Sequence, residues 1–150
     1  MLSYRSEVSI GRSPETVFRY LIDPALQPLW SDVPMRQLTT GDPQPGSQLE
    51  VTFAMGPVKA RIGLELSRVE HGRVLAFRSF SGPIRWDGEY RLASTDGGDT
   101  LVSQEGRLTF SGAWRLIEPF VGAEISRGEV KELEKLKTVV EQQEGDQRGS

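Results

Sequence analysis

Two polar residues, Gln104 and Tyr90, occupy positions where the sequence pattern otherwise places apolar side chains. Gln104 lies in an alternating segment on the same side as Val102 and Phe110, and Tyr90 shares its side with Trp86 in the preceding segment. A buried amide without a hydrogen-bond partner costs about 1–3 kcal/mol, so Gln104 needs a ligand group, Tyr90 or a water beside it. A phenol can donate a hydrogen bond or act as a weak acid. Both residues are therefore candidates for ligand contact and for acid–base chemistry.

Large apolar side chains share the inner side of the pattern with these two residues. Apolar pockets with a few polar groups are the usual form of small-molecule sites, so these side chains could be the walls of one. The alternative is that they simply fill a hydrophobic core. The candidate ligand-binding residues are Phe53, Met55, Phe77, Trp86, Tyr90, Gln104, Phe110, Trp114, Ile117 and Phe120.

Several common chemistries lack the residues that they require. The sequence has no cysteine, and its one histidine, His71, lies in a predicted hairpin turn with Gly72. This composition excludes a cysteine nucleophile and a multi-histidine or Cys/His metal site. A serine triad would have to recruit His71, and neither a Gly-x-Ser-x-Gly elbow nor a phosphate-binding glycine loop is present. We therefore expect no metal and no cofactor, and no catalytic set is assigned.

The candidate residues lie in segments where apolar and polar residues alternate, which is the pattern of half-buried β-strands. Turn residues such as Gly82-Pro83 and Asp96-Gly97-Gly98-Asp99 separate these segments. Such sequential hairpins predict an antiparallel meander with one apolar face, and Gly88 and Gly106 on that face would let the sheet bend. The predicted strands are 3–10, 33–38, 49–55, 58–67, 74–80, 84–92 and 102–110.

Helix signals occur near the two ends of the chain. Ser13-Pro14-Glu15 combines an N-cap serine, a proline in the first turn and an acidic residue, and Asp23-Pro24 predicts a second, short helix. The last helix is predicted over 113–143. Its charged residues, Glu132 among them, are assigned to an exposed face, while Pro119 and the glycines of its first half predict bends. The inner stripe is predicted to consist of Val130, Leu133, Leu136 and Val140.

The predicted order is therefore one strand, two helices, six strands and a long helix. The apolar sheet face needs a cover, and the final helix is the only element long enough to supply it. We expect an α+β fold in which a curved, seven-stranded antiparallel sheet wraps around the C-terminal helix. The chain has 150 residues, a length that suits one domain. We expect this domain at 1–143, followed by a flexible tail at 144–150.

Charge and hydropathy limit the partners. The net charge of −3 argues against nucleic acid as the main partner. No apolar run approaches the roughly 20 residues that span a bilayer, so we expect no stable membrane insertion. Arg5 and Glu7 fall where a signal peptide would be apolar, and a cytoplasmic location is expected. A monomer and a homodimer both remain open.

The order of elements and several short motifs resemble the START-like, or polyketide cyclase/dehydrase and lipid-transport (SRPBCC), superfamily. The resemblance covers nearly the whole chain, and its motifs are typical of the fold and of no particular reaction. It implies a helix-grip fold with a cavity between sheet and C-terminal helix that holds an apolar or amphipathic molecule. The residues that carry it are Ser13-Pro14-Glu15-Thr16-Val17-Phe18, Pro28-Leu29-Trp30, Gly46, Gly88-x-Tyr90-x-Leu92 and Thr100-x-Val102.

Three functions follow as hypotheses. The first is binding of a small hydrophobic molecule, such as a lipid, in that cavity. The second is an enzyme of the cyclase, dehydratase or isomerase type, with Tyr90 as acid–base group and Gln104 as hydrogen-bond donor; a buried acidic residue in the pocket would favour it. The third is a protein-interaction module, which would need an apolar patch on the outer sheet face, where the pattern places charges. Trp30, Pro28 and the loop at 43–46 are expected either to form an entrance or to pack the helix junction.

Overall fold

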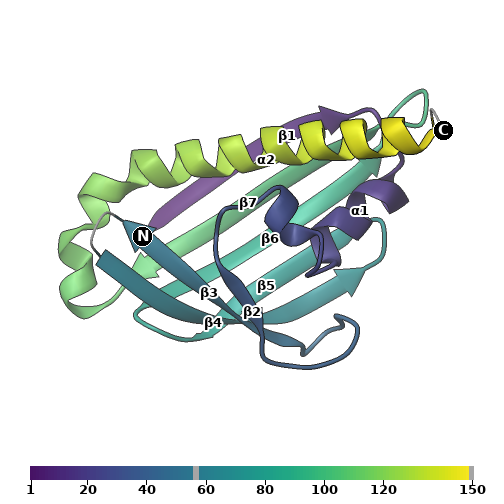
Figure 1. The fold of residues 1–150 in the computed structure, drawn as a ribbon. Coiled ribbons are helices and arrows are strands. Elements are labelled where there is room, and N and C mark those ends of the chain that lie inside the picture. The colour runs from purple at the N-terminus through teal and green to yellow at the C-terminus, as the bar shows by residue number, and fades with distance from the viewer. Residues whose placement is uncertain (56–57, 149–150) are drawn as a thin grey trace.

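Seven strands form a single antiparallel sheet in the order β1-β7-β6-β5-β4-β3-β2. They come from a computed structural model that describes residues 1–55 and 58–148, apart from the side chains of residues 55, 58 and 144–148. Neighbours from β2 to β7 follow one another in the chain, and β1 joins the sheet by pairing with β7 (Figure 1). The strands are β1 (Leu2–Ile10), β2 (Met35–Gln37), β3 (Gln48–Met55), β4 (Val58–Glu70), β5 (Val74–Ser81), β6 (Ile84–Ser94) and β7 (Thr100–Phe110).

Two helical segments follow β1 and close one end of the sheet: α1 (Pro14–Ile22) and the 3-10 turn η1 (Gln27–Leu29). Ser13 caps α1 as predicted, because its Oγ accepts a hydrogen bond of 3.3 Å from the Thr16 amide. The predicted second helix is reduced to the three residues of η1. Two prolines within five residues, Pro24 and Pro28, remove amide donors, and the ring of the second blocks a longer helix.

The long C-terminal helix begins later and ends later than predicted. Residues Gly112–Leu116 form a 3-10 segment, η2, and α2 runs from Glu118 to Arg148. Pro119 thus lies in the first turn of α2, where amide groups have no partner within a helix, so it does not bend the helix interior. The helix continues through the first residues of the segment expected to be a tail, whose last two residues lie outside the described range.

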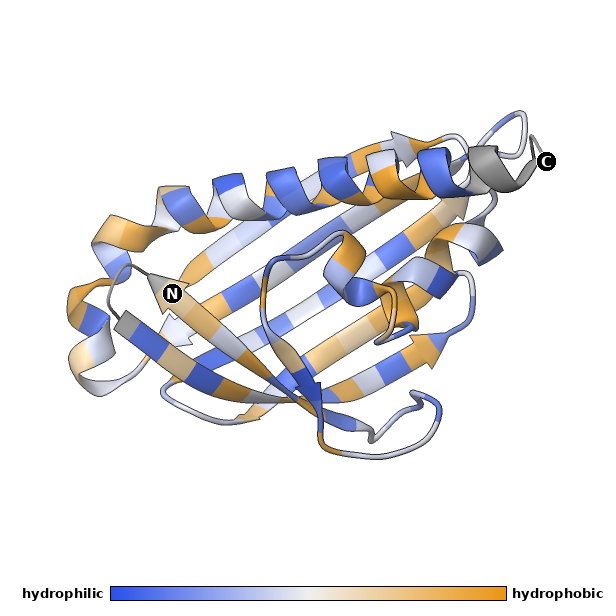
Figure 2. Cartoon of the chain, viewed as in Figure 1, coloured by the Kyte–Doolittle hydropathy of each residue, from blue (hydrophilic) through white to orange (hydrophobic). Residues whose placement is uncertain are grey.

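The sheet curves beneath α2, which crosses its concave face (Figure 1). Hydrophobic and hydrophilic residues alternate along the strands, as half-buried sheets require (Figure 2). The α+β helix-grip fold expected from the sequence is therefore confirmed. Two hydrophobic clusters fill opposite ends of the interior. One joins α1 to the last turns of α2 around Leu136, and the other joins β3, β4 and β7 to Val121 at the start of α2.

Gly88 and Gly106 face each other across β6 and β7 and point toward the interior. A Cβ at Gly88 would collide with the Phe77 ring, and a Cβ at Gly106 would collide with the Tyr4 ring. The two glycines therefore leave room for the Phe77 and Tyr4 rings to lie close against the sheet. This keeps space open between the sheet and the middle of α2.

Candidate functional site

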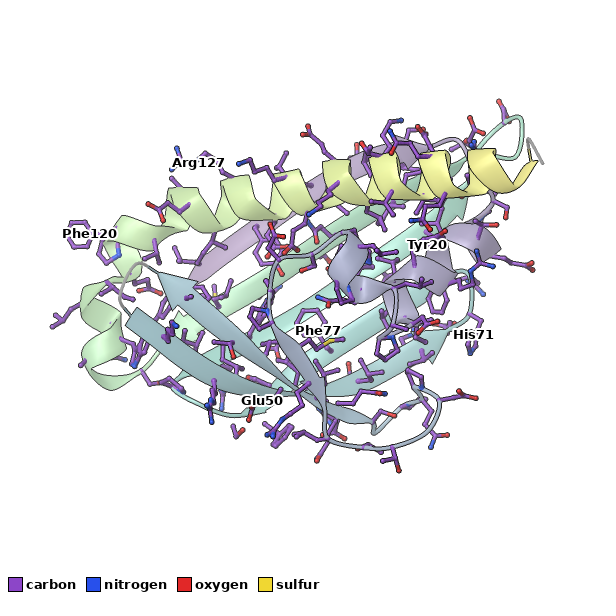
Figure 3. All side chains as sticks on the ribbon, viewed as in Figure 1. Tyr20, Glu50, His71, Phe77, Phe120 and Arg127 are labelled. Carbon is purple, nitrogen blue, oxygen red and sulfur yellow. The ribbon has the colours of Figure 1, made fainter. Side chains whose placement is uncertain are left out.

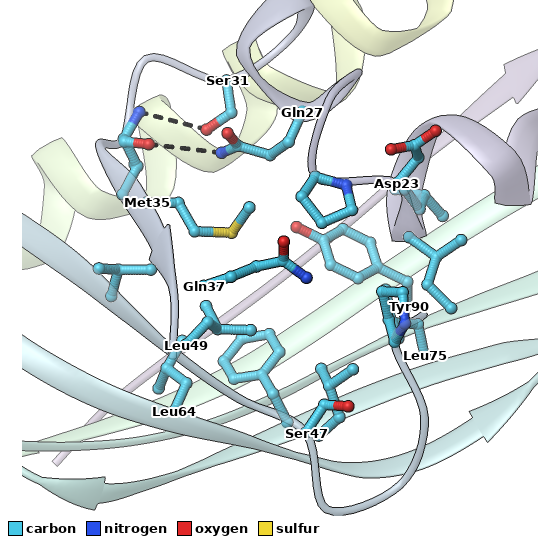
Figure 4. Close-up of a pocket in the computed structure, with 18 of the residues that line it drawn as sticks. Asp23, Gln27, Ser31, Met35, Gln37, Ser47, Leu49, Leu64, Leu75 and Tyr90 are labelled. Carbon is cyan, nitrogen blue, oxygen red and sulfur yellow. Dashed lines mark hydrogen bonds between the residues drawn. The ribbon is translucent and has the colours of Figure 1, made fainter. Parts of the chain in front are cut away.

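Between the sheet, the α1–η1 segment and α2 lies a cavity of about 120 Å³. Its walls are mostly apolar side chains, with Tyr90, Gln27, Ser31 and Gln37 as polar members (Figure 4). The main apolar wall residues are Leu21, Ile22, Trp30, Val33, Met35, Leu49, Val51, Leu64, Leu66, Leu75, Phe77 and Trp86.

A second cavity, of about 210 Å³, lies beside the first, toward the start of α2. It is lined by Phe53 and Leu108 from the sheet and by Ile125 from α2. The two cavities share wall residues, so they are adjacent compartments of one interior space. The shared residues are Val33, Val51, Trp86, Glu129 and Glu132.

Glu129 and Glu132, one turn apart on α2, are the acidic residues at this shared wall. They lie on the stripe that also carries Ile125, Leu133 and Leu136, because residues three and four apart share one face of a helix. The prediction that Glu132 lies on the exposed face is wrong. Val130, predicted on the inner stripe, is instead 43% exposed.

Glu129 is the more strongly perturbed carboxyl group. Burial raises the pKa of Glu129 to about 8, the charge of Glu132 adds to the rise, and the Gln104 amide partly offsets it. A carboxylic acid with this pKa retains its proton near neutral pH. It can then donate a hydrogen bond or a proton inside the cavity, which an ordinary surface glutamate cannot do.

Glu132 has polar partners that Glu129 lacks. The Ser31 hydroxyl donates a hydrogen bond of 2.9 Å to Oε1 of Glu132. Burial raises the pKa of Glu132, while this hydrogen bond opposes the rise; Asp32 adds to it and Lys135 opposes it. The environments of the two carboxyl groups thus differ, and such a difference assigns the acid and the base in a pair. Near neutral pH Glu129 is the group that holds a proton to donate, and the Ser31 hydrogen bond favours the carboxylate form of Glu132.

Two tyrosines lie near these carboxyl groups, Tyr90 in the wall of the first cavity and Tyr4 outside both cavities. Tyr4 accepts a hydrogen bond of 3.0 Å from the indole Nε1 of Trp86. The Tyr90 hydroxyl makes no hydrogen bond with another residue that the structure describes, and it lines the first cavity. Burial raises the pKa of Tyr90 well above its usual range, and the negative charges of Glu129 and Glu132 add to the rise. The phenol therefore stays protonated and can donate to a ligand.

Gln104 is buried, as the pattern predicts, but its partners belong to the protein. Its Nε2 donates hydrogen bonds of 3.0 Å to Ser6 Oγ and to the Glu129 carbonyl oxygen. It therefore ties β7 to β1 and to α2, and it is not among the residues that line either cavity. A role for Gln104 is to hold the turn of α2 that carries Glu129.

The predicted aromatic wall is partly present. Phe77 and Trp86 line the first cavity in a T-shaped contact, with ring centroids 5.0 Å apart, and Phe53 lines the second. Phe110 is buried behind Phe53, with centroids 6.3 Å apart. Trp114 and Ile117 pack on the same cluster from η2 and the residue after it, and line neither cavity. The side chain of Met55 lies outside the described part of the chain.

Phe120 is a wrong prediction. Its side chain is 79% exposed and points away from the sheet (Figure 3). Because α2 begins at Glu118, its inner stripe starts with Val121, which is 2% exposed, and continues to Ile125 and Glu129. Phe120 lies one residue, or about 100°, away from that stripe.

The loops after α1 form the end of the first cavity that lies opposite α2. Trp30 is buried and its Nε1 donates a hydrogen bond of 2.8 Å to the Tyr20 carbonyl oxygen, so it packs the helix junction. Pro43 and Ser47 from the following loop also line the cavity. His71 lies in a turn as predicted and contacts the Phe18 ring edge-on, at 5.4 Å between centroids.

Two features are absent from the described residues. They contain no group of three or more His, Cys, Asp or Glu side chains that could hold a metal ion. Among them, too, no helix combines the length and the apolar character needed to cross a bilayer.

A curved antiparallel sheet that holds an interior cavity against one long helix defines the class of helix-grip, START-like proteins. Residues 1–141 match the family model described as polyketide cyclase / dehydrase and lipid transport, and the chain belongs to this family. The membership inferred from the sequence motifs is thereby confirmed. Comparison with curated protein sequences finds no match.

Solved structures share the fold at low sequence identity. The protein TTHA0849 from Thermus thermophilus is 19% identical, with a TM-score of 0.76 over 92% of this chain and 96% of that one. A START superfamily protein from Mycobacterium smegmatis is 15% identical, with a TM-score of 0.75 over 93% and 97%. The Zhui aromatase/cyclase from Streptomyces sp. R1128 is 15% identical, with a TM-score of 0.74 over 93% of each chain.

Proposed function

We propose that this protein binds a small hydrophobic or amphipathic molecule in the two adjacent cavities beneath α2. The observation that carries the proposal is the unfilled interior itself: side chains of the sheet, of η1 and of α2 enclose space where a core would be packed. An apolar ligand would restore the contacts that these side chains lack. Membership in a family described by cyclase, dehydrase and lipid transport supports the same function.

Affinity would come mainly from apolar area, at about 25 cal/mol per Å² removed from water. The Tyr90 hydroxyl and the two glutamates would orient the ligand, because they line the first cavity and can each form a hydrogen bond to it. Phe53, Phe77 and Trp86 would contact its apolar part.

Solution binding tests this proposal. We expect a hydrophobic fluorescent probe to bind the purified protein, and native mass spectrometry to detect a lipid-like molecule bound to it. Leu49→Phe places extra volume in the first cavity and should weaken the probe at least severalfold. Leu29→Phe is the matched control, since Leu29 is 38% exposed and lines neither cavity. Equal binding by both variants, or no binding by the wild type, would reject the proposal.

A second function, acid–base catalysis on a polyketide-like substrate, is favoured by one observation that the sequence pattern missed. Two carboxyl groups with different environments, Glu129 and Glu132, meet the same cavity as the Tyr90 hydroxyl. Glu129 would act as the proton donor and Glu132 as the base, with Gln104 as a positioning residue.

Turnover measurements separate catalysis from binding. If Glu129 is the acid, the rate should fall as pH rises through about 8, because the acid form is lost above its pKa. Glu129→Gln should abolish turnover even at saturating ligand, so that a change in affinity cannot account for the loss. A Glu129→Gln variant that keeps wild-type turnover would reject the catalytic function and leave the binding function intact.

A further inference from the structure

The interior of this protein is lined by acidic side chains, and no basic side chain accompanies them among the described residues. No Lys, Arg or His is among the described residues that line either cavity, whereas Glu129 and Glu132 line both. Asp23 adds a third carboxyl group to the first cavity, and Glu124 adds one to the second. Buried carboxylates in proteins are normally paired or hydrogen-bonded. A cationic group of a ligand could therefore be the partner that these carboxyl groups lack.

The cation that acts on Glu132, Lys135, is engaged outside the two cavities. Lys135 Nζ binds Asp32 Oδ1 at 3.3 Å, and its side chain is 46% exposed. It influences Glu132 through space, but the described residues show no ion pair to either Glu129 or Glu132. Glu132 thus accepts a hydrogen bond from a neutral donor, Ser31, and no positively charged side chain among the described residues pairs with Glu129.

Aromatic rings surround the same space. Trp30 and Tyr90 meet edge to face, with centroids 6.3 Å apart, and Phe77 and Trp86 form a second edge-to-face pair. All four rings line the first cavity together with the two glutamates. The faces of such rings attract cations, most strongly when water is excluded.

An unpartnered phenol provides a third, independent indication of a ligand. The Tyr90 hydroxyl lines the first cavity without a hydrogen-bond partner among the described residues. A protonated amine carries several N–H donors, which a carboxylate pair and a phenol oxygen can accept together. An anionic ligand would instead face repulsion from every charged group that lines the cavities.

We propose that the ligand of this cavity carries a basic nitrogen, which binds as an ammonium ion between Glu129 and Glu132 while its apolar body lies against the aromatic rings. This inference rests on the proposed binding function and narrows its ligand class to hydrophobic amines. The carboxyl groups of Glu129 and Glu132 and the Tyr90 hydroxyl would then share one role, which is to bind the ammonium group.

Binding of such a ligand should release a proton. An ammonium ion beside Glu129 favours its charged form, so the carboxyl group gives up the proton that burial makes it hold in the free protein. Glu132 opposes that ionisation from α2 and Gln104 favours it from β7, while the neutral phenols of Tyr90 and Tyr4 face the same cluster from β6 and β1. Asp32 and Lys135 act on Glu132 with opposite signs. Amine affinity should therefore rise with pH until Glu129 is ionised in the free protein.

The test compares three probes with one aromatic body: naphthylmethylamine, naphthylmethanol and naphthoate. Titration calorimetry of the full chain should show the amine binding about tenfold tighter than the alcohol near neutral pH, with naphthoate weakest. Amine affinity should increase about tenfold between about pH 6 and pH 8, where an alkylammonium stays charged. Buffers of different ionisation enthalpy should report a proton released for the amine only.

Variants assign the effect to the two glutamates. Glu129→Gln and Glu132→Gln should each lower amine affinity about tenfold and change alcohol affinity less than about twofold, which also shows that the variants are folded. Glu134→Gln is the control, because Glu134 is an exposed residue of the same helix. Alcohol binding without any preference for the amine overturns this inference and leaves the cavity a binding site. Failure of all three probes to bind rejects the cavity as a ligand site and this inference with it.

Discussion

Two parts of the inner face of α2, its C-terminal half and its middle, have the same helical spacing but contact different surroundings. In the C-terminal half, Leu133, Leu136 and Val140 are almost fully buried among α1 and the ends of the strands. In the middle, Glu129 and Glu132 continue the stripe and meet two cavities in place of packed side chains. The C-terminal half holds the helix on the sheet, and the middle leaves room and charge for another molecule. A candidate site is therefore found where a buried stripe stops being apolar.

The largest difference between the halves should appear on truncation. Leu136 is 0% exposed, so Leu136→Ala should lower the free energy of unfolding by about 2–5 kcal/mol through lost burial and a new cavity. Leu49→Ala should cost clearly less, because Leu49 borders space that is already empty. Urea denaturation of both variants measures the two costs. Equal losses would mean that the middle of the interior is packed as tightly as the end.

The middle of the helix should instead show a pH-dependent penalty. The pKa of Glu129 is raised in the folded protein, so its contribution to stability is complete below the unfolded pKa of about 4.5 and is lost as pH rises through about 8. Within that window the loss is at most about 1.4 kcal/mol per pH unit. Glu129→Gln removes it, so between pH 5 and pH 8 the variant should gain stability relative to the wild type, by at most about 4 kcal/mol.

Urea denaturation at several pH values measures this difference, with Glu134→Gln as the exposed control on the same helix. A stability difference between Glu129→Gln and the wild type that stays constant from pH 5 to pH 8 would contradict the buried, protonated state of Glu129.

The contrast also marks the limit of what the sequence predicts. Strand alternation and the Ser13 cap identify the sheet, α1 and the covering helix, because period-two and period-3.6 patterns report burial directly. Extending the stripe of Leu136 and Leu133 toward the N-terminus, however, allows either Val130 or Glu129 as its next member. Hydrophobicity selects Val130, and the structure places Glu129 inside.

The positions of Ile125 and Val121 in the sequence could have identified Glu129 as the inward-facing residue. Counting backward in steps of four from Leu133 passes through Glu129, Ile125 and Val121, all of which face the interior. A stripe assigned by hydrophobicity alone omits any polar residue that function places on it. The cavity itself has no sequence signal, since empty space depends on how side chains from β3, β5, β6 and α2 meet in three dimensions.

The hydrogen bond from Ser31 is one feature that distinguishes Glu132 from Glu129, and it predicts an effect of intermediate size. Ser31→Ala removes a donor from a partly buried carboxylate, so the pKa of Glu132 should rise further and stability should fall by about 1–2 kcal/mol near neutral pH. NMR titration of the Glu132 side-chain carbonyl carbon measures the first effect. Ser111→Ala is a control, because the Ser111 side chain caps no helix. An unchanged titration of Glu132 would show that the serine does not distinguish the two acids.

The smallest effect concerns the first turn of α2, where of two adjacent apolar residues one lies on the stripe and the other lies about 100° away from it. Phe120 is 79% exposed and Val121 is 2% exposed, so their truncation costs should rank opposite to their sizes. Phe120→Ala should change the free energy of unfolding by less than about 0.5 kcal/mol, as exposed substitutions do. Val121→Ala should cost about 1–3 kcal/mol, because removal of its buried methyl groups leaves a void in the cluster that also contains Tyr4 and Phe110. Thermal denaturation of the two variants tests which face of α2 is turned inward at this end. A larger loss of stability for Phe120→Ala than for Val121→Ala would mean that the inner stripe is shifted by one residue. That shift would also move Glu129 out of the cavity.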